Sequence, residues 1–386
     1  MNGEVAVIGI GETPVGRVSE YDATQLYAMA ARDAAEDAGI ALGDIDALIT
    51  GNSRSQPFMY HAESLAEYLG VEFRHCATVD TGGATTFEVM HQAAVEIAAG
   101  EYDTALVVMA DSLLSGLGRD QTVNTLATLA HADWERPFGI TIPGIYALMA
   151  NRYMHDHGIT PEQTAVACVN DRYHASLNPG AMFRDPLTVD DVLASKPIAA
   201  PLRLFDCAPV ADGGCAVLLA GPGAAAGAPK PPVHVRGYGE SYGPEHVSQN
   251  RSLAQTPGTE SAAAAFEQAG IGRDQVDLAM IYDPFSFVQC LFLEDVGFCG
   301  RGEGADFIAS GETRLGGSLP VNTHGGVLSY GHPGRPTALF CICEAVKQLR
   351  GEAEGRQVEG AEFALAHAEG GAMSTQATII LGGSAR

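Results

Sequence analysis

The feature that most constrains the fold of this 386-residue chain is an internal repeat. The segment AAEDAGIALGDIDALI, around Gly39 and Asp46, matches AAFEQAGIGRDQVDLAMI, around Gly270 and Asp277, at one offset of 231 residues. Each segment predicts a helix that ends at the glycine, followed by a short loop with an aspartate and then a strand. A shared offset of this length predicts one fold built from two similar halves.

A second pair of segments follows the first pair in the same order. Residues 82–101 and 334–352 each predict an amphipathic helix that starts just after a glycine and ends in Gly-Glu. The helices are followed by predicted strands at 104–110 and 362–368, and each strand precedes a turn of small residues. The agreement in order supports a duplicated α/β architecture.

The repeat also sets the expected domain boundaries. The N-terminal half is expected at 1–222 and the C-terminal half at 231–386, joined by the Gly/Ala/Pro-rich linker GPGAAAGAPKPP. A long insertion at about 112–205, with a helix expected from Ile145 to His157, interrupts the first half. Insertions of that length commonly cover a substrate.

The composition indicates a globular cytoplasmic enzyme. Hydrophobic residues make up 46% of the chain, and its formal net charge of −25 would repel nucleic acid and anionic membranes. A basic partner, or a local basic region for an anionic substrate, stays compatible with that charge. The N-terminus is expected to form a strand rather than a signal peptide, and the apolar runs are too short to span a bilayer.

The cysteine pattern predicts neither a disulfide framework nor a metal site. Eight cysteines are scattered without any CxxC pair. Cys341 and Cys343 fall on an apolar helical stretch, where small buried core residues are expected.

Several motifs resemble those of the thiolase superfamily across nearly the whole chain. They are DGGCAVLLAG at 212–221, NTHGGVLSYGHPG at 322–334 and HAEGGAMSTQATIIL at 367–381. The segment at 282–308 is similar to the sterol-carrier-protein, or lipid-transfer, type within that superfamily. The resemblance implies an α/β thiolase fold, with two βαβαβ-type halves related by a pseudo-two-fold axis and an added loop domain.

The chain departs from thiolases at the nucleophile. Their reactive cysteine begins the first central helix, where backbone N–H groups stabilise a thiolate, and the family spacing places Gly83 at that position. Cys76 lies seven residues earlier, in or just after the preceding strand, and is expected to be a core thiol. A glycine forms no thioester, so ping-pong acyl transfer is not expected.

Two positions of the thiolase site keep functional side chains. His332 matches the histidine of the Gly-His-Pro segment, and Tyr282 occupies the site of the family's Asn-Glu-Ala-Phe or His-Asp-Cys-Phe motif. Either side chain could be the base and the other the oxyanion donor. Further candidates fall into two groups: oxyanion or substrate contacts at Gly83 and Gly371, and secondary site residues at Tyr330, His324 and Asp283.

The lost nucleophile and the Tyr-Asp motif are similar to the steroid side-chain aldolases, although those carry a second tyrosine in the segment that here reads Gly331-His332-Pro333. The resemblance implies retro-aldol cleavage of a bulky β-hydroxyacyl-CoA to a ketone or aldehyde and a shorter acyl-CoA. Two alternatives stay open at this point: a Claisen-type acyltransferase, and a CoA-ester or lipid carrier without activity. The sequence identifies neither the acyl group nor the direction of the reaction.

The resemblance also implies partners. Thiolase-like chains of this type often act with a small OB-fold protein that carries a zinc ribbon, so zinc is expected only in that partner. A homodimeric core is expected as well. Coenzyme A is expected as part of the substrate rather than as a permanently bound cofactor.

Overall fold

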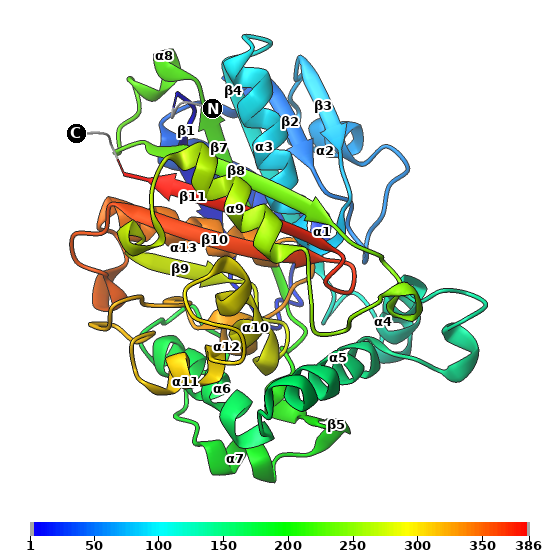
Figure 1. Cartoon of the computed structure of the whole chain (residues 1–386). Helices are drawn as coiled ribbons and strands as arrows, with labels where there is room; N and C mark the ends of the chain where they lie inside the picture. The colour runs from blue at the N-terminus through cyan, green and yellow to red at the C-terminus, as the bar shows by residue number, and fades with distance from the viewer. Residues whose placement is uncertain (1–3, 384–386) are drawn as a thin grey trace.

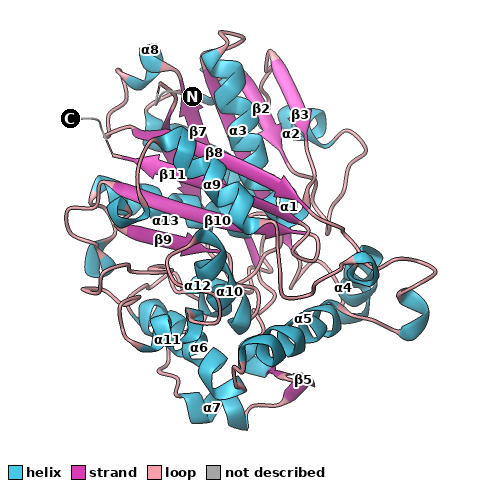
Figure 2. Ribbon diagram, viewed as in Figure 1, coloured by secondary structure: helices cyan, strands magenta, loops and turns pink. Residues whose placement is uncertain are grey.

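A computed structural model describes residues 4–383 (Figure 1, Figure 2). Its main feature is a nine-stranded mixed sheet in the order β3-β2-β4-β7-β1-β8-β11-β10-β9, beside a small hairpin of β5 and β6. The strands are β1 (Ala6–Glu12), β2 (Ala47–Thr50), β3 (His75–Thr78), β4 (Thr104–Ser112), β5 (Pro197–Ala199), β6 (Leu202–Arg203), β7 (Asp212–Ala220), β8 (Val233–Tyr242), β9 (Leu278–Ile281), β10 (Phe363–Gly370) and β11 (Thr375–Gly382). The helices are α1 (Ala23–Ala38), α2 (His61–Leu69), α3 (Thr85–Ala98), α4 (Arg119–Leu126), α5 (Ile142–His157), α6 (Pro161–Ser176), α7 (Val189–Ala194), α8 (Pro222–Ala225), α9 (Gly258–Ala269), α10 (Ser286–Val296), α11 (Gly304–Ala309), α12 (Gly326–Tyr330) and α13 (Thr337–Arg350).

The two halves of the sheet have the same topology on either side of the β1–β8 pair. On one side β1, β7, β4 and β2 follow one another, and on the other side β8, β11, β10 and β9 do. In both halves the first two pairings are antiparallel and the third is parallel. A parallel bridge between Ala279 and Val321 takes the place that β3 has beside β2. The predicted thiolase fold with two similar halves is therefore confirmed.

The repeated sequence segments form the same local structure. Gly39 and Gly270 end α1 and α9 in the left-handed conformation, with φ values of 68° and 69°. The carboxylate of Asp46 accepts hydrogen bonds from the amides of residues 103 and 104, where β4 begins. The carboxylate of Asp277 accepts from the amides of residues 362 and 363, where β10 begins. In each half the aspartate therefore ties the loop after the outer helix to the start of a central strand.

The central helices α3 and α13, each of 14 residues, pack against each other and against strands of both halves. Helix α1 packs on β1, β7 and β4, and α9 packs on β8 and β11, so these two helices cover the outer faces (Figure 1). Cys341 and Cys343 lie on α13, 1% and 0% exposed, as expected for core residues. All eight cysteines are free thiols. Within residues 4–383 the helices are too short or too polar to cross a membrane.

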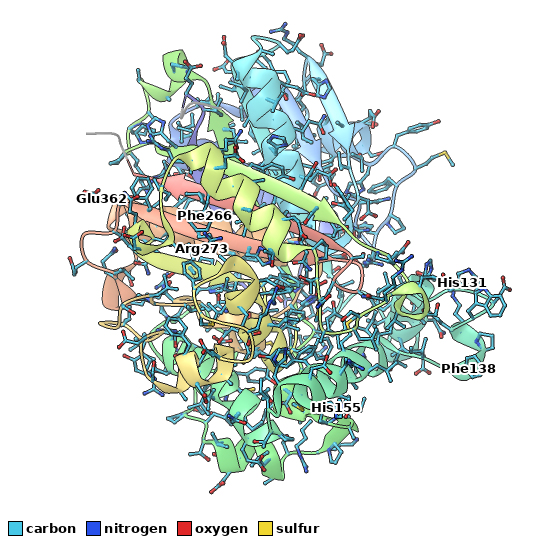
Figure 3. All side chains as sticks on the ribbon, viewed as in Figure 1. His131, Phe138, His155, Phe266, Arg273 and Glu362 are labelled. Carbon is cyan, nitrogen blue, oxygen red and sulfur yellow. The ribbon has the colours of Figure 1, made fainter. Side chains whose placement is uncertain are left out.

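The insertion lies between β4 and β7 and supplies α4 to α7. Helix α5 begins at Ile142, three residues before its predicted start, because the hydroxyl of Thr141 caps the amide of Gly144 and Pro143 occupies the first turn. Helix α6 packs against α10, α11 and α12 of the second half to form the lower lobe of Figure 1. The segment between α4 and α5 extends from the body, with His131 and Phe138 near its far end (Figure 3).

Candidate active site

A cavity of about 590 Å³ opens where loops of both halves meet the insertion. We call it the main cavity. The second half contributes Tyr282, His332 and Glu369 to its wall, and the first half contributes Arg54 and Gly83. Apolar side chains of the insertion complete the cover, among them those of Leu129 and Ile142.

Tyr282 and His332 are in direct contact in this cavity. The phenol oxygen of Tyr282 lies 2.6 Å from Nε2 of His332, in hydrogen-bonding distance. Tyr282 follows β9, and its amide donates to the carbonyl of His367 at 2.9 Å. The backbone of His332 is held by residues 209–211, through bonds of 2.9 Å and 3.1 Å. Both side chains therefore project from backbone that is fixed by its own hydrogen bonds.

Burial keeps this pair neutral at physiological pH. Burial, and then the negative charge of Glu369, raise the pKa of Tyr282 well above its usual value. Burial lowers the pKa of His332 to about 4, and the positive charge of Arg54 contributes to the same shift. A neutral imidazole can accept a proton at Nε2 or carry one there, depending on its tautomer, while the phenol can donate. The pair can therefore pass a proton in either direction.

Gly83 faces this pair at the start of the first central helix. A methyl group on Gly83 would lie 2.3 Å from the carbonyl oxygen of Glu369 and 3.3 Å from the ring carbon and oxygen of Tyr282. The 3-10 turn Gly82–Ala84 precedes α3, and the first residues of a helix leave their N–H groups free to bind an anion. The site thus leaves no room for a side chain at position 83, and the backbone of Gly83 itself forms part of the cavity wall.

The described wall of the main cavity contains no cysteine. Cys76 lies in β3 and packs, half-buried, against the core. Burial, together with the charge of Glu63, raises the pKa of this thiol. Cys76 therefore lacks both the position and the low pKa of a nucleophile.

Glu369 is a site residue that the sequence analysis did not single out. Its carboxylate accepts a hydrogen bond from the phenol of Tyr146, on α5, and another of 2.8 Å from the amide of Met373. Burial raises the pKa of Glu369 to about 7, against the opposing effect of these two hydrogen bonds. A carboxyl group with this pKa can give or take a proton near neutral pH. The sequence feature that could have indicated Glu369 is its position as a charged residue within the otherwise apolar strand FALAHAEGG.

Two arginines line the cavity next to residues of the first half: Arg54 of that half and Arg335 of the second half. The guanidinium of Arg335 donates to Asp80 and, at 2.8 Å, to the carbonyl of Asn52. Arg54 lines the same wall, and burial lowers its pKa, as does the charge of Arg335. The charge of Arg335 is thus compensated by Asp80, and Arg54 is a second positive charge on a wall that also holds the carboxyl groups of Glu245 and Glu369.

The structure divides the predicted site residues between three places. Tyr282, His332, Gly83 and Gly371 line the main cavity together. Tyr330 and His324 line a second cavity of about 400 Å³, which we call the Lys347 cavity. Asp283 is fully buried, accepts a 2.7 Å hydrogen bond from the amide of Val327 and lines neither cavity.

Four charged side chains of the Lys347 cavity form two pairs. Glu344 accepts two hydrogen bonds from Arg356, and Lys347 pairs with Glu12. Within residues 4–383 one group of potential metal ligands lies beside this cavity, formed by Glu12 of its wall and the buried Cys215 and Cys343. The ammonium group of Lys347 already compensates the only carboxylate of this group.

The chain is similar to thiolases over both halves. The family model for the thiolase N-terminal domain matches residues 5–221, and that for the thiolase C-terminal domain-like family matches residues 239–383. An acetyl-CoA acetyltransferase of Methanothermobacter thermautotrophicus is 35% identical, covering 98% of this chain and 99% of that protein. A steroid side-chain-cleaving aldolase of Thermomonospora curvata is 32% identical, covering 90% and 91%. A solved structure described as the Ltp2-ChsH2(DUF35) aldolase superposes with a TM-score of 0.89 at 30% identity, covering 100% of this chain and 99% of that one.

Proposed function

Because the chain belongs to the thiolase family, we propose that it is a carbon-carbon lyase that cleaves a bulky β-hydroxyacyl-CoA by a retro-aldol reaction. The products are a ketone or aldehyde and a shorter acyl-CoA, and no acyl-enzyme forms. The names of the aldolase relatives support the reaction class.

The observation that carries the proposal is the hydrogen bond between Tyr282 and His332 opposite a glycine. A thiolase reaction needs a nucleophile at this point, and Gly83 supplies none. Retro-aldol cleavage needs a base for the β-hydroxyl group, donors for the enolate oxygen and an acid for the α-carbon. Groups suited to each of these roles line the main cavity.

The proton transfers can be assigned to named groups. The β-hydroxyl group gives its proton to the oxygen of Tyr282 while the phenol proton moves to Nε2 of His332. The bond between the α- and β-carbons breaks, the β-carbon becomes a carbonyl, and the electron pair forms the thioester enolate. Amide groups at Gly83 and Gly371 stabilise the enolate oxygen.

Glu369 then protonates the α-carbon from its neutral form, which burial favours up to a pH of about 7. The proton left on His332 returns to Glu369 through solvent, so the cycle consumes no net proton. Coenzyme A takes part only as the thiol portion of substrate and product.

Product analysis tests this proposal. The protein is incubated with β-hydroxyacyl-CoA esters that carry either a steroid-sized or a short acyl chain, and carbonyl product and shorter acyl-CoA are quantified by mass spectrometry. We expect both products in equal amounts from the bulky ester, and an unchanged intact protein mass. A stoichiometric acyl adduct on Cys76 or any other cysteine would contradict the mechanism.

A Claisen-type acyltransferase is the second candidate, and the acetyltransferase name of one relative favours it. Such a reaction would have to proceed without the thioester that a cysteine at position 83 would form. Acyl transfer to a second acyl-CoA, without carbonyl release from β-hydroxyacyl esters, would support this candidate. The absence of both activities would support the carrier alternative.

The proposed assembly has a homodimeric core and a small OB-fold partner that carries a zinc ribbon. The similar aldolase structure is named for two components, Ltp2 and ChsH2(DUF35), which supports a partner for this chain. We also propose a cytoplasmic location. Co-purification with a partner encoded nearby should raise solubility or activity, and equal behaviour of the chain alone would count against the partner.

A further inference from the structure

Arg54 is held at the main cavity by a loop with a fixed backbone. The loop connects β2 to α2, and the carboxylate of Asp111, at the end of β4, binds it. Asp111 accepts hydrogen bonds from the amides of Arg54 and Ser55, at 2.7 Å and 3.0 Å, and from the hydroxyl of Ser53 at 3.1 Å. The loop is therefore preorganised to present one side chain, that of Arg54, to the cavity.

The guanidinium group of Arg54 has no hydrogen-bond or ion-pair partner among residues 4–383, whereas Arg335 on the same wall is fully engaged by Asp80 and Asn52. The Arg54 side chain is partly buried in the cavity wall, and even partial burial of a charged donor without a partner is unfavourable. Burial, together with the charge of Arg335, lowers the pKa of Arg54, and the more distant charges of Asp80 and Asp111 oppose that shift. An arginine kept in this state inside a cavity fits an anionic ligand that completes its hydrogen bonds.

The position of Arg54 decides which part of a ligand it meets. Arg54 lines the main cavity together with Tyr282 and His332, and its positive charge influences both, so we place its side chain on the wall of the reacting end. In the proposed reaction the thioester and the β-carbon occupy this end. The phosphates of coenzyme A lie a whole pantetheine arm away from the thioester, so an anion at Arg54 belongs to the acyl part.

We propose that Arg54 binds a carboxylate carried by the acyl group, so that the preferred substrate is a CoA ester with a second, free carboxyl group near the reacting carbons. This inference rests on the proposed function for the place of the thioester. A guanidinium group and a carboxylate form two parallel hydrogen bonds, which fixes the orientation of the acyl chain as well as its affinity. The two-point contact would hold the β-carbon against Tyr282.

Binding measurements test the inference without turnover. The full chain is titrated calorimetrically with two matched pairs of esters, succinyl-CoA against butyryl-CoA and glutaryl-CoA against pentanoyl-CoA. The members of each pair have equal chain length and differ in the terminal carboxylate. We expect at least one dicarboxylic ester to bind about ten-fold or more tightly than its partner, the scale of a hydrogen bond to a charged group.

Variants assign the preference to one residue. Arg54→Met should abolish the preference, Arg54→Lys should retain part of it, and Arg152→Met, on the exposed face of α5, should leave it unchanged. A preference that persists in Arg54→Met, or equal binding within both pairs in the wild type, overturns the inference. Equal weakening of all four esters in Arg54→Met also overturns it, since that result would indicate a phosphate contact. If product analysis shows no retro-aldol activity while the preference depends on Arg54, the carboxylate site stands and only the reaction is wrong.

Discussion

The loops that follow β2 and β9 occupy equivalent positions in the two halves, yet they differ in chemistry. The two strands have the same offset as Gly39 and Gly270, and each is preceded by a 3-10 turn at that offset. After β9 the chain presents Tyr282, which is hydrogen-bonded to His332. After β2 it presents Arg54, whose guanidinium group is unpaired among the described residues. The duplicated scaffold is the same, and the divergence is concentrated where the strands end.

The starts of the central helices differ in the same way. Helix α3 starts behind Gly82 and Gly83, whose backbone faces the cavity, whereas α13 starts behind Arg335, which is tied to Asp80 across the two halves. The start of α3 therefore presents backbone to the cavity, whereas the start of α13 carries the ion pair between Arg335 and Asp80. The two halves thus share their secondary structure but differ in the side chains at the ends of equivalent elements, and those side chains form the wall of the main cavity.

The largest effect is expected from the loop of the second half. His332→Ala and Tyr282→Phe should each lower kcat by about a hundred-fold or more, the scale of lost proton transfer or oxyanion stabilisation. Tyr330→Phe, in the Lys347 cavity, is the matched control and should stay near wild type. Steady-state kinetics of carbonyl release measure all three. Wild-type turnover in both His332→Ala and Tyr282→Phe would remove the base and the donor from the mechanism.

A smaller effect is expected at Glu369. Because its raised pKa of about 7 keeps the carboxyl protonated at lower pH, kcat/KM should fall as pH rises above about 7. Glu369→Gln should lose roughly ten- to a hundred-fold in kcat, together with this alkaline limb. Tyr146→Phe removes a hydrogen bond that lowers the pKa of Glu369, so the limb should move to higher pH. A limb that does not move in this variant would assign the titration to another group.

Gly83→Ala should act on binding and stability rather than on proton transfer. The added methyl group meets the carbonyl of Glu369 at 2.3 Å, so backbone must shift at a cost of about 1–3 kcal/mol in the free energy of unfolding. KM should rise, and kcat should fall less than in Tyr282→Phe, since the shift displaces the amide of Gly83 but removes no proton-transfer group. Gly118→Ala is the control, because a methyl group there meets no atom within 4 Å. Equal denaturation midpoints for the two variants would disprove the steric argument.

The smallest expected effect is on the free energy of unfolding, and it compares equivalent aspartates of the two halves. Asp46→Asn and Asp277→Asn each weaken two hydrogen bonds from strand amides to a carboxylate, so each should cost about 1 kcal/mol in urea-induced unfolding. The loss in Asp46→Asn should be the larger of the two, because this carboxylate also accepts from the hydroxyl of Thr104 and lies 3.6 Å from the guanidinium group of Arg74. A loss in one variant only would show that the repeat conserves the motif in sequence but not its energetic role.

The sequence predicts best what depends on local chemistry. Gly39, Gly270 and the aspartates that follow them define helix ends and loops through short-range contacts, so their pattern predicts both structure and repeat. The predicted start of α5 at Ile145 is three residues too late, because Pro143 and Gly144 favour a loop in sequence whereas the hydroxyl of Thr141 caps a helix that includes both.

The rest of the site depends on contacts between distant segments. The hydrogen bond from Tyr146 to Glu369 joins residues 223 positions apart, and Asp111 positions Arg54 from a strand 57 positions away. Neither pair has a local signal. Tyr282 and Asp283 are neighbours in the sequence but project to different surroundings, because successive residues of extended chain point to opposite sides. Only the folded chain separates their environments.

The close approach of Gly83 to the carbonyl of Glu369 has an evolutionary consequence. Glycine and cysteine codons can differ by a single base, so a cysteine at the thiolase nucleophile position is one mutation away in the genetic code. Any side chain there must first displace the backbone at the end of β10, which itself carries Glu369. The first mutation would therefore weaken the protein before a second could make the thiol useful. Selection on single steps would oppose that path, so the contact acts as a barrier against the gain of a cysteine at this position.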